Sequence, residues 1–221
     1  MKKTILLFAA ALLLLVNHVH AQNFKELLLK TYLAFDTTQD QQQKVQYSNK
    51  FDLLAKKFPN EWAAHYYNAF SKAVLSYNDK DEAKRDAWLD EAERERDETV
   101  ALLKKENDET YVLAAMIANA RLAVKPQARW QKFGKIFEED LAKAKDINPD
   151  NPRIYYLQGM SKRFTPKMFG GGKKAALPYF EKAASLFAKE TDNEDIINHI
   201  SWGKATNQHF LKEAQGEAEE Q

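Results

Sequence analysis

The sequence of 221 residues contains no cysteine. This absence excludes disulfide scaffolds, thiolate zinc sites, cysteine nucleophiles and lipid attachment at a cysteine. The chain also lacks a surplus of either charge, with 33 Lys and Arg against 32 Asp and Glu. A nucleic-acid binder or a polybasic membrane-surface protein needs excess positive charge to offset phosphate, so neither class is expected.

Long apolar runs are also missing. The longest one covers residues 5–16, which is 12 residues, whereas a membrane-spanning helix needs about 20. Two lysines precede the run, and Val19 and Ala21 stand three and one positions before a possible cleavage point. This arrangement predicts a secretory signal peptide, residues 1–21, that is cut after Ala21. A retained N-terminal anchor helix is the alternative, and it would need a longer apolar run.

Cleavage would remove 21 residues, two lysines among them, and leave a mature chain of 200 residues with 31 basic and 32 acidic groups. A chain of that size buries a core without metal or disulfides. We expect an exported protein, periplasmic or secreted, with one globular domain over residues 22–212. A flexible tail rich in Glu and Gln is expected at residues 213–221.

Glycine and proline are scarce, with 7 and 6 copies, and neither occurs between residues 60 and 125. That stretch is rich in Ala, Leu, Glu, Lys and Arg, which favour long helices. Elsewhere apolar residues recur at helical spacing, for example Phe133, Ile136, Phe137 and Leu141. No segment alternates apolar and polar residues for long enough to predict a strand, so the expected fold class is all-α.

The sequence also contains a degenerate internal repeat. A shift of 90 residues superposes Pro59 on Pro149, Tyr66 on Tyr156, and Ser71 and Lys72 on Ser161 and Lys162. A further shift of 44 carries Gly159 to Gly203. If the 90-residue shift spans two repeats, the repeating unit is about 45 residues long, a length typical of helical repeat proteins.

The best-defined copy resembles the tetratricopeptide repeat (TPR) family. Phe137, Leu141, Ala144 and Pro149 stand at the spacing of that family's second helix and closing proline, and residues 148–152 resemble its inter-repeat turn. The resemblance covers most of residues 40–210. It implies a right-handed α-solenoid of about four antiparallel helical hairpins, with a concave surface lined by the first helix of each unit. The period near 45 exceeds the family's value of about 34.

The segment from Thr165 to Gly172 carries a second resemblance. Its proline, phenylalanine and glycine run is similar to an insertion in the helical periplasmic T-component of TRAP-type transporters; the residues are Pro166, Phe169, Gly170, Gly171 and Gly172. This resemblance implies an alternative function as a periplasmic solute-binding accessory of a transporter. Arg153 or Arg163 would then hold an organic acid.

Candidate catalytic and metal sites are weak. The run Gly170–Gly172 before Lys173 lacks the first glycine and the Ser or Thr of a phosphate-binding loop, so a plain connection between helices is favoured. Glu61 and His65 stand four residues apart and could supply two metal ligands, but one pair is not a site. We therefore expect no catalytic residue, no metal and no cofactor, and a binding protein rather than an enzyme.

The remaining charged and aromatic residues are assigned to surface and core. Carboxylates between residues 79 and 109 are expected to face solvent in ion pairs such as Asp81–Arg85 and Asp90–Arg94. One tryptophan falls in each of four helical stretches, and all four are expected to pack between repeats; they are Trp62, Trp88, Trp130 and Trp202.

A candidate binding surface follows from the helical spacing of residues 152–164. Arg153, Tyr156, Met160 and Arg163 are separated by three, four and three positions and share one face, and Tyr66 and Phe70 occupy the matching places in the earlier copy. Arg, Tyr and Met are enriched at protein contacts, although packing against a neighbouring helix is an equal alternative. We predict an exported scaffold whose concave surface binds a protein or peptide partner through these residues. Neither nucleic-acid binding nor membrane insertion after cleavage is expected.

Overall fold

The computed structural model describes residues 23–190, 195–197 and 199–219. The predicted signal peptide, residues 1–21, lies outside the described residues. Within the described part of the chain, no helix is long and apolar enough to cross a membrane.

The described residues form helices, most of them joined by short turns, and no strand occurs among them. A helical segment covers residues 23–37. The others are α2 (Gln41–Lys57), α3 (Trp62–Asn78), α4 (Glu82–Leu103), α5 (Asp108–Val124), α6 (Pro126–Ile147), α7 (Pro152–Phe164), the short 3₁₀ helix η1 (Lys167–Phe169), α8 (Lys173–Phe187) and α9 (Lys204–Glu219). The predicted all-α class is confirmed. The predicted tail boundary at residue 213 falls inside α9, where Ala214 is fully buried.

Short polar side chains set where these helices begin. The Asp40 carboxylate accepts a hydrogen bond from the backbone N–H of Gln43 at the start of α2, and Asn107 and Thr110 form a reciprocal capping box at the start of α5. Asp81 caps α4 in the same way, accepting from two backbone N–H groups. Such caps satisfy N–H groups that have no partner inside the helix.

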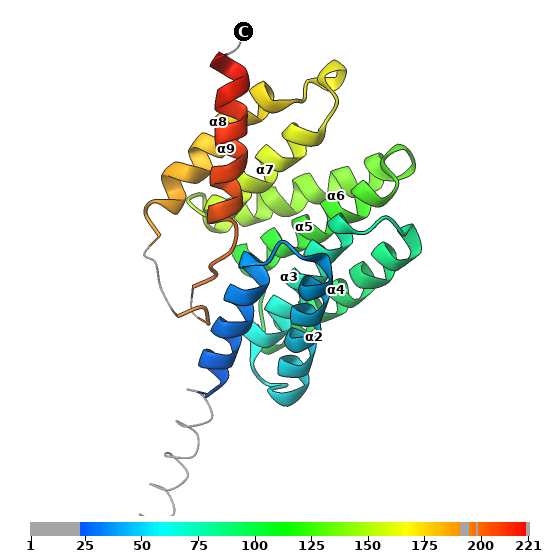
Figure 1. The fold of residues 1–221 in the computed structure, drawn as a ribbon, viewed down its shortest axis with the longest axis vertical. Helices are drawn as coiled ribbons and strands as arrows, with labels where there is room; N and C mark the ends of the chain where they lie inside the picture. Colours follow the sequence, from blue (N-terminus) through cyan, green and yellow to red (C-terminus); the bar gives the residue numbers. More distant parts are fainter. Residues whose placement is uncertain (1–22, 191–194, 198, 220–221) are drawn as a thin grey trace, which may run out of the picture.

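Consecutive helices pack as antiparallel hairpins, α3 with α4, α5 with α6, and α7 with α8 (Figure 1). The hairpins are stacked one on the next, with α3 against α5 and α5 against α7, and α9 lies along α8. The helix 23–37 joins α2 through an edge-to-face contact of Phe35 with Phe51 at 5.8 Å. This arrangement agrees with a helical-repeat-like protein.

Two arginines of the α5–α6 hairpin connect this hairpin to α4. Arg121 of α5 donates hydrogen bonds to Asp86, Asp90 and Glu93, and Arg129 of α6 donates to both carboxylate oxygens of Asp86 at 2.7 Å. Hydrogen bonds from Arg129, and then from Arg121, lower the pKa of Asp86 to about 2. The predicted pairing of Asp90 with Arg94 is therefore wrong, because Arg121 approaches from the next helix.

Gly159 marks the closest approach of α7 to α8. A Cβ atom added there would lie 2.6 Å from the ring of Phe180, which is fully buried. Gly159→Ala is expected to lower the free energy of unfolding by about 1–3 kcal/mol, because a packed core has no room for the methyl group. Urea unfolding followed by circular dichroism measures this change.

Gly134→Ala in α6 is the matched control, since the added Cβ would meet only Leu122 at an ordinary 3.7 Å. This variant should gain about 1 kcal/mol from helix propensity. Equal effects of the two substitutions would contradict the close contact at Gly159.

Candidate functional site

A segment late in the chain covers the surface formed by α3 and α7, which is called the inner face here. The residues that follow α8, 195–197 and 199–203, are called the return segment here, and they lie across α3 and α7. Trp202 is 1% exposed, and its indole N–H donates to the Tyr66 hydroxyl at 2.9 Å. Its ring stacks on Phe70 at 5.1 Å and meets the edge of Tyr156 at 6.1 Å.

The return segment also connects to the N-terminal helix. The Tyr32 hydroxyl donates to the Ser201 carbonyl at 2.7 Å, and the Ser201 backbone N–H donates to the Tyr67 hydroxyl at 3.3 Å. Burial raises the pKa of Tyr67 above its usual range, so this hydroxyl keeps its proton. The first helix, α3 and the return segment are thus joined by buried polar contacts.

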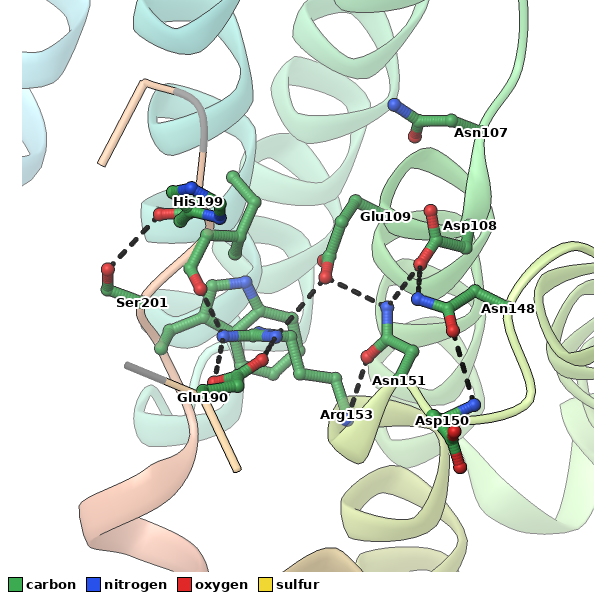
Figure 2. A network of polar contacts seen from close by, with 12 residues as sticks. Asn107, Asp108, Glu109, Asn148, Asp150, Asn151, Arg153, Glu190, His199 and Ser201 are labelled. Atoms are coloured by element: carbon green, nitrogen blue, oxygen red, sulfur yellow. Dashed lines mark hydrogen bonds and ion pairs between the residues drawn. The ribbon is translucent and has the colours of Figure 1, made fainter. Parts of the chain in front are cut away.

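Arg153 holds the return segment from the α7 side (Figure 2). Its side chain is 2% exposed and donates to Glu190 at 2.8 Å, to Glu109 at 3.2 Å and to the Ile200 carbonyl. Its guanidinium therefore links α5, α7 and both ends of the connection between α8 and α9.

The surroundings of Arg153 stabilise its charge. Burial alone would lower the pKa of Arg153, but the carboxylates of Glu109 and Glu190 outweigh burial and raise it. The guanidinium also lies 5.5 Å from the ring centres of Phe187 and Trp202, where aromatic faces attract cations. Burial raises the pKa of Glu109, and Arg153 acts against that rise.

The turn before α7 is fixed by the same network. The Asn151 amide donates to Asp108 at 2.9 Å and to Glu109 at 2.8 Å, while its oxygen accepts from the Arg153 backbone N–H. Asn148 donates to Asp108 at 2.8 Å. A surface depression of about 200 Å³ lies beside these residues. Since their polar groups bind one another, we assign the depression to the structure of the turn and not to a ligand site.

The six residues predicted to bind a partner therefore differ in how far they are buried. Tyr66, Phe70, Arg153 and Tyr156 are buried under or beside the return segment. A partner could reach them only after that segment moved away, so their role in partner binding stays a prediction. Met160 is partly buried against the core, whereas Arg163 is nearer the surface and donates to Glu213 of α9 at 3.3 Å.

The predicted loop folds back on the end of α7. The Gly172 N–H donates to the Lys162 carbonyl at 2.9 Å, and the backbone angle φ of Gly172 is +103°. A Cβ on Gly171 would lie 2.0 Å from the Thr165 carbonyl oxygen. The glycine run is thus needed for the turn itself.

Beside this loop, large apolar side chains face solvent. Phe164, Met168 and Phe169 are 65%, 82% and 70% exposed, and Phe210 of α9 meets the edge of Phe164 at 6.0 Å. We define the rim patch as Phe164, Met168, Phe169, His209 and Phe210. Sequence reasoning found the loop but missed most of this patch. The available signal was three large apolar residues between 164 and 169, in a stretch rich in lysine.

The segment that carries Phe164, Met168 and Phe169 is rich in positive charge. Residues 162–174 contain five basic side chains and no acidic one; the basic residues are Lys162, Arg163, Lys167, Lys173 and Lys174. The Arg163 guanidinium lies over the Phe164 ring at 5.4 Å. An exposed apolar patch with a basic border is suited to a ligand that is apolar and carries negative charge.

The Glu61 and His65 pair does not converge with further metal ligands. Instead, His65 Nδ1 lies 2.8 Å from Glu95 and its Nε2 lies 3.2 Å from the Pro59 carbonyl oxygen. In the described residues, no group of three or more His, Cys, Asp or Glu is placed to hold a metal ion. The adjacent surface depression of about 610 Å³ holds charges that pair with one another, as Lys72 does with Glu91 at 2.8 Å.

The fold defines the class, an all-α protein of stacked helical hairpins. No protein-family model matches the chain, and no curated protein matches it. The solved structure of the HusA haemophore from Porphyromonas gingivalis is similar to it, with a TM-score of 0.72 and 30% sequence identity. The match covers 88% of this chain and 94% of HusA, so the chain belongs to the HusA haemophore family. This relationship favours binding over catalysis.

Arg153→Met is expected to lower the free energy of unfolding by about 3 kcal/mol, because it leaves the largely buried carboxylate of Glu109 without its counter-charge. Urea unfolding measures the loss. Arg94→Met is the control, since Arg94 is 61% exposed and its ion pair contributes little. A loss at Arg153 no larger than that at Arg94 would mean that the buried network does not hold the fold together.

His65 gives a pH-dependent contribution to stability. Its hydrogen bond with Glu95 raises the pKa of His65 above the usual 6.5. Burial works to raise the pKa of Glu95, but the bond with His65 lowers it overall. The stabilisation is therefore complete just below pH 6.5 and is lost as the pH rises through the raised pKa of His65.

We expect the difference in unfolding free energy between wild type and His65→Gln to be largest near pH 5–6 and to shrink towards pH 9. Denaturant unfolding at several pH values measures it. In a Glu95→Gln background the pH dependence should shrink, because the largest contribution to the raised pKa of His65 is removed while the contact with the Pro59 carbonyl remains. An undiminished pH dependence there would show that Glu95 is not the main partner.

Proposed function

We propose that this protein is exported and binds haem or a related porphyrin on the rim patch. The observation that carries the proposal is the exposure of three large apolar side chains, Phe164 against Phe210 of α9 and Met168 and Phe169 in the loop that follows α7. Membership of the HusA haemophore family supports this ligand class, and the predicted signal peptide supports export.

The chemistry of a porphyrin matches the composition of this surface. The macrocycle is flat and apolar, so aromatic rings such as Phe164 and Phe169 can pack against its face. Its two propionate groups are carboxylates, which Arg163 and the neighbouring lysines can bind. Burial of the exposed rings against the ligand supplies the apolar part of the affinity.

The concave face remains a second candidate, for a protein or peptide partner. The observation in its favour is that it already accepts a non-helical stretch of the chain, since Trp202 packs against Phe70 and Tyr156. A TPR-like solenoid would bind a partner's peptide in the same place. The transporter-accessory alternative instead predicts that the protein binds a small organic acid, and binding measurements on the purified protein can test this.

Ferric haem added to the purified protein should bind saturably with one molecule per chain, as followed by the Soret absorbance and by quenching of tryptophan fluorescence. A panel of small organic acids, followed by thermal shift, serves as the comparison. Absence of saturable haem binding, together with a shift by one organic acid, would move the assignment to the transporter-accessory alternative.

The double variant Phe164→Ala/Phe169→Ala is expected to raise the Kd for haem roughly 100-fold, since burial of two aromatic side chains contributes about 3 kcal/mol. Leu53→Ala is the control. Leu53 is 62% exposed on α2, which lies at the opposite end of the stack from the α7–α8 hairpin (Figure 1). If both variants bound haem like wild type, the ligand would have to lie elsewhere.

A further inference from the structure

The loop that connects α7 to α8 holds two large apolar side chains in water. Met168 and Phe169 are 82% and 70% exposed, and they lie in the short helix η1. The backbone of this helix is fixed, since the N–H groups of Phe169 and Gly170 donate to the carbonyls of Pro166 and Lys167 at 2.9 and 3.0 Å. The loop therefore presents the two side chains outward on an ordered turn, and such exposure is typical of an interaction surface.

A neighbouring hairpin adds an exposed tryptophan at the same end of the stack. The first helices of consecutive hairpins, α5 and α7, run in the same direction, so the α5–α6 turn and the α7–α8 connection lie at one end (Figure 1). Trp130, close to the start of α6, is 59% exposed. The predicted packing of Trp130 between repeats is therefore wrong.

The same two segments carry a local surplus of positive charge. Residues 125–135 contain four basic side chains and residues 162–174 contain five, and neither segment contains an acidic one. Two of the four in the first segment pair with acids of α4. In the second segment, three lysines have no carboxylate partner among the described residues; they are Lys162, Lys173 and Lys174.

An apolar tip flanked by lysines matches the chemistry of an anionic bilayer. Aromatic side chains favour the boundary between lipid headgroups and acyl chains, while lysines are attracted to the lipid phosphates. The expectation that this chain does not bind a membrane surface rested on its balanced net charge, which carries no information on where the charges lie. A bilayer also yields around a protruding loop, whereas a rigid partner would need a matching groove.

We infer that this end of the protein docks on the surface of an anionic lipid bilayer. The docking face consists of Trp130, Met168, Phe169, Lys162, Lys173 and Lys174. Met168 and Phe169 enter the headgroup region, and the lysines bind phosphates beside them. The inference does not depend on porphyrin binding. Phe169 belongs to both surfaces, so a bilayer and a porphyrin exclude one another there.

The test is cosedimentation of the haem-free protein with vesicles of phosphatidylcholine alone and with vesicles that also contain phosphatidylglycerol. We expect binding to the anionic vesicles that weakens as salt is added, because salt screens the lysines. Brominated lipids in the anionic vesicles should quench tryptophan fluorescence. This quenching should be lost in Trp130→Phe, since Trp130 is the tryptophan of the docking face.

Two variants separate the apolar and the charged contributions. Met168→Ser/Phe169→Ser should weaken binding to the anionic vesicles about tenfold or more, because two apolar side chains no longer enter the lipid. The variant in which Lys162, Lys173 and Lys174 are all replaced by Gln should weaken it about 100-fold, since each lysine near an anionic surface contributes about fivefold.

Matched controls come from the opposite end of the stack. Leu53→Ser removes an apolar side chain that is 62% exposed, and Lys30→Gln/Lys50→Gln/Lys57→Gln removes three exposed positive charges. Both should bind the anionic vesicles like wild type. Absence of binding to these vesicles, equal binding to the neutral ones, or equal losses in the controls would overturn the inference. Binding without quenching of Trp130 would also overturn it, because the protein would then be docked through another face.

Discussion

The guanidinium of Arg153 is the group on which the interior of this protein depends. It is almost fully buried, and it balances carboxylates from α5 and from the end of the α7–α8 hairpin while also binding a carbonyl of the return segment. A buried charge is tolerated only when it is paired, so these three parts of the chain must assemble together. Trp202 completes the assembly by filling the space between Phe70 and Tyr156.

Closure of the inner face has a consequence for binding. In an open solenoid the inner helices offer the natural surface for a partner, but here the chain itself occupies that surface. Phe164, Met168 and Phe169, which are among the most exposed large apolar side chains, lie instead at the α7–α8 connection, where Phe164 meets Phe210 of α9. The two regions therefore differ in kind: one is a packed polar and aromatic interior, and the other is an exposed aromatic surface bordered by lysines.

The HusA relationship is consistent with this division. Under the proposed function, a porphyrin would bind at the end of the stack of hairpins, where α7 and α9 fix the position of Phe164 while solvent reaches its ring. The glycine run 170–172 contributes by folding the loop tightly against the end of α7, which keeps Met168 and Phe169 at the surface.

Local sequence signals were sufficient to predict the all-α class and the positions of turns such as residues 148–152, because caps, prolines and helical periodicity act over a few residues. The burial of Arg153 and Tyr66 was decided only by the tertiary structure. Tyr66 meets Trp202 across 136 positions, and Tyr32 meets Ser201 across 169. Periodicity shows that Arg153 and Tyr156 share a helix face, but it carries no information on which distant segment covers that face. The rim patch likewise needed α9 to bring His209 and Phe210 beside Phe164.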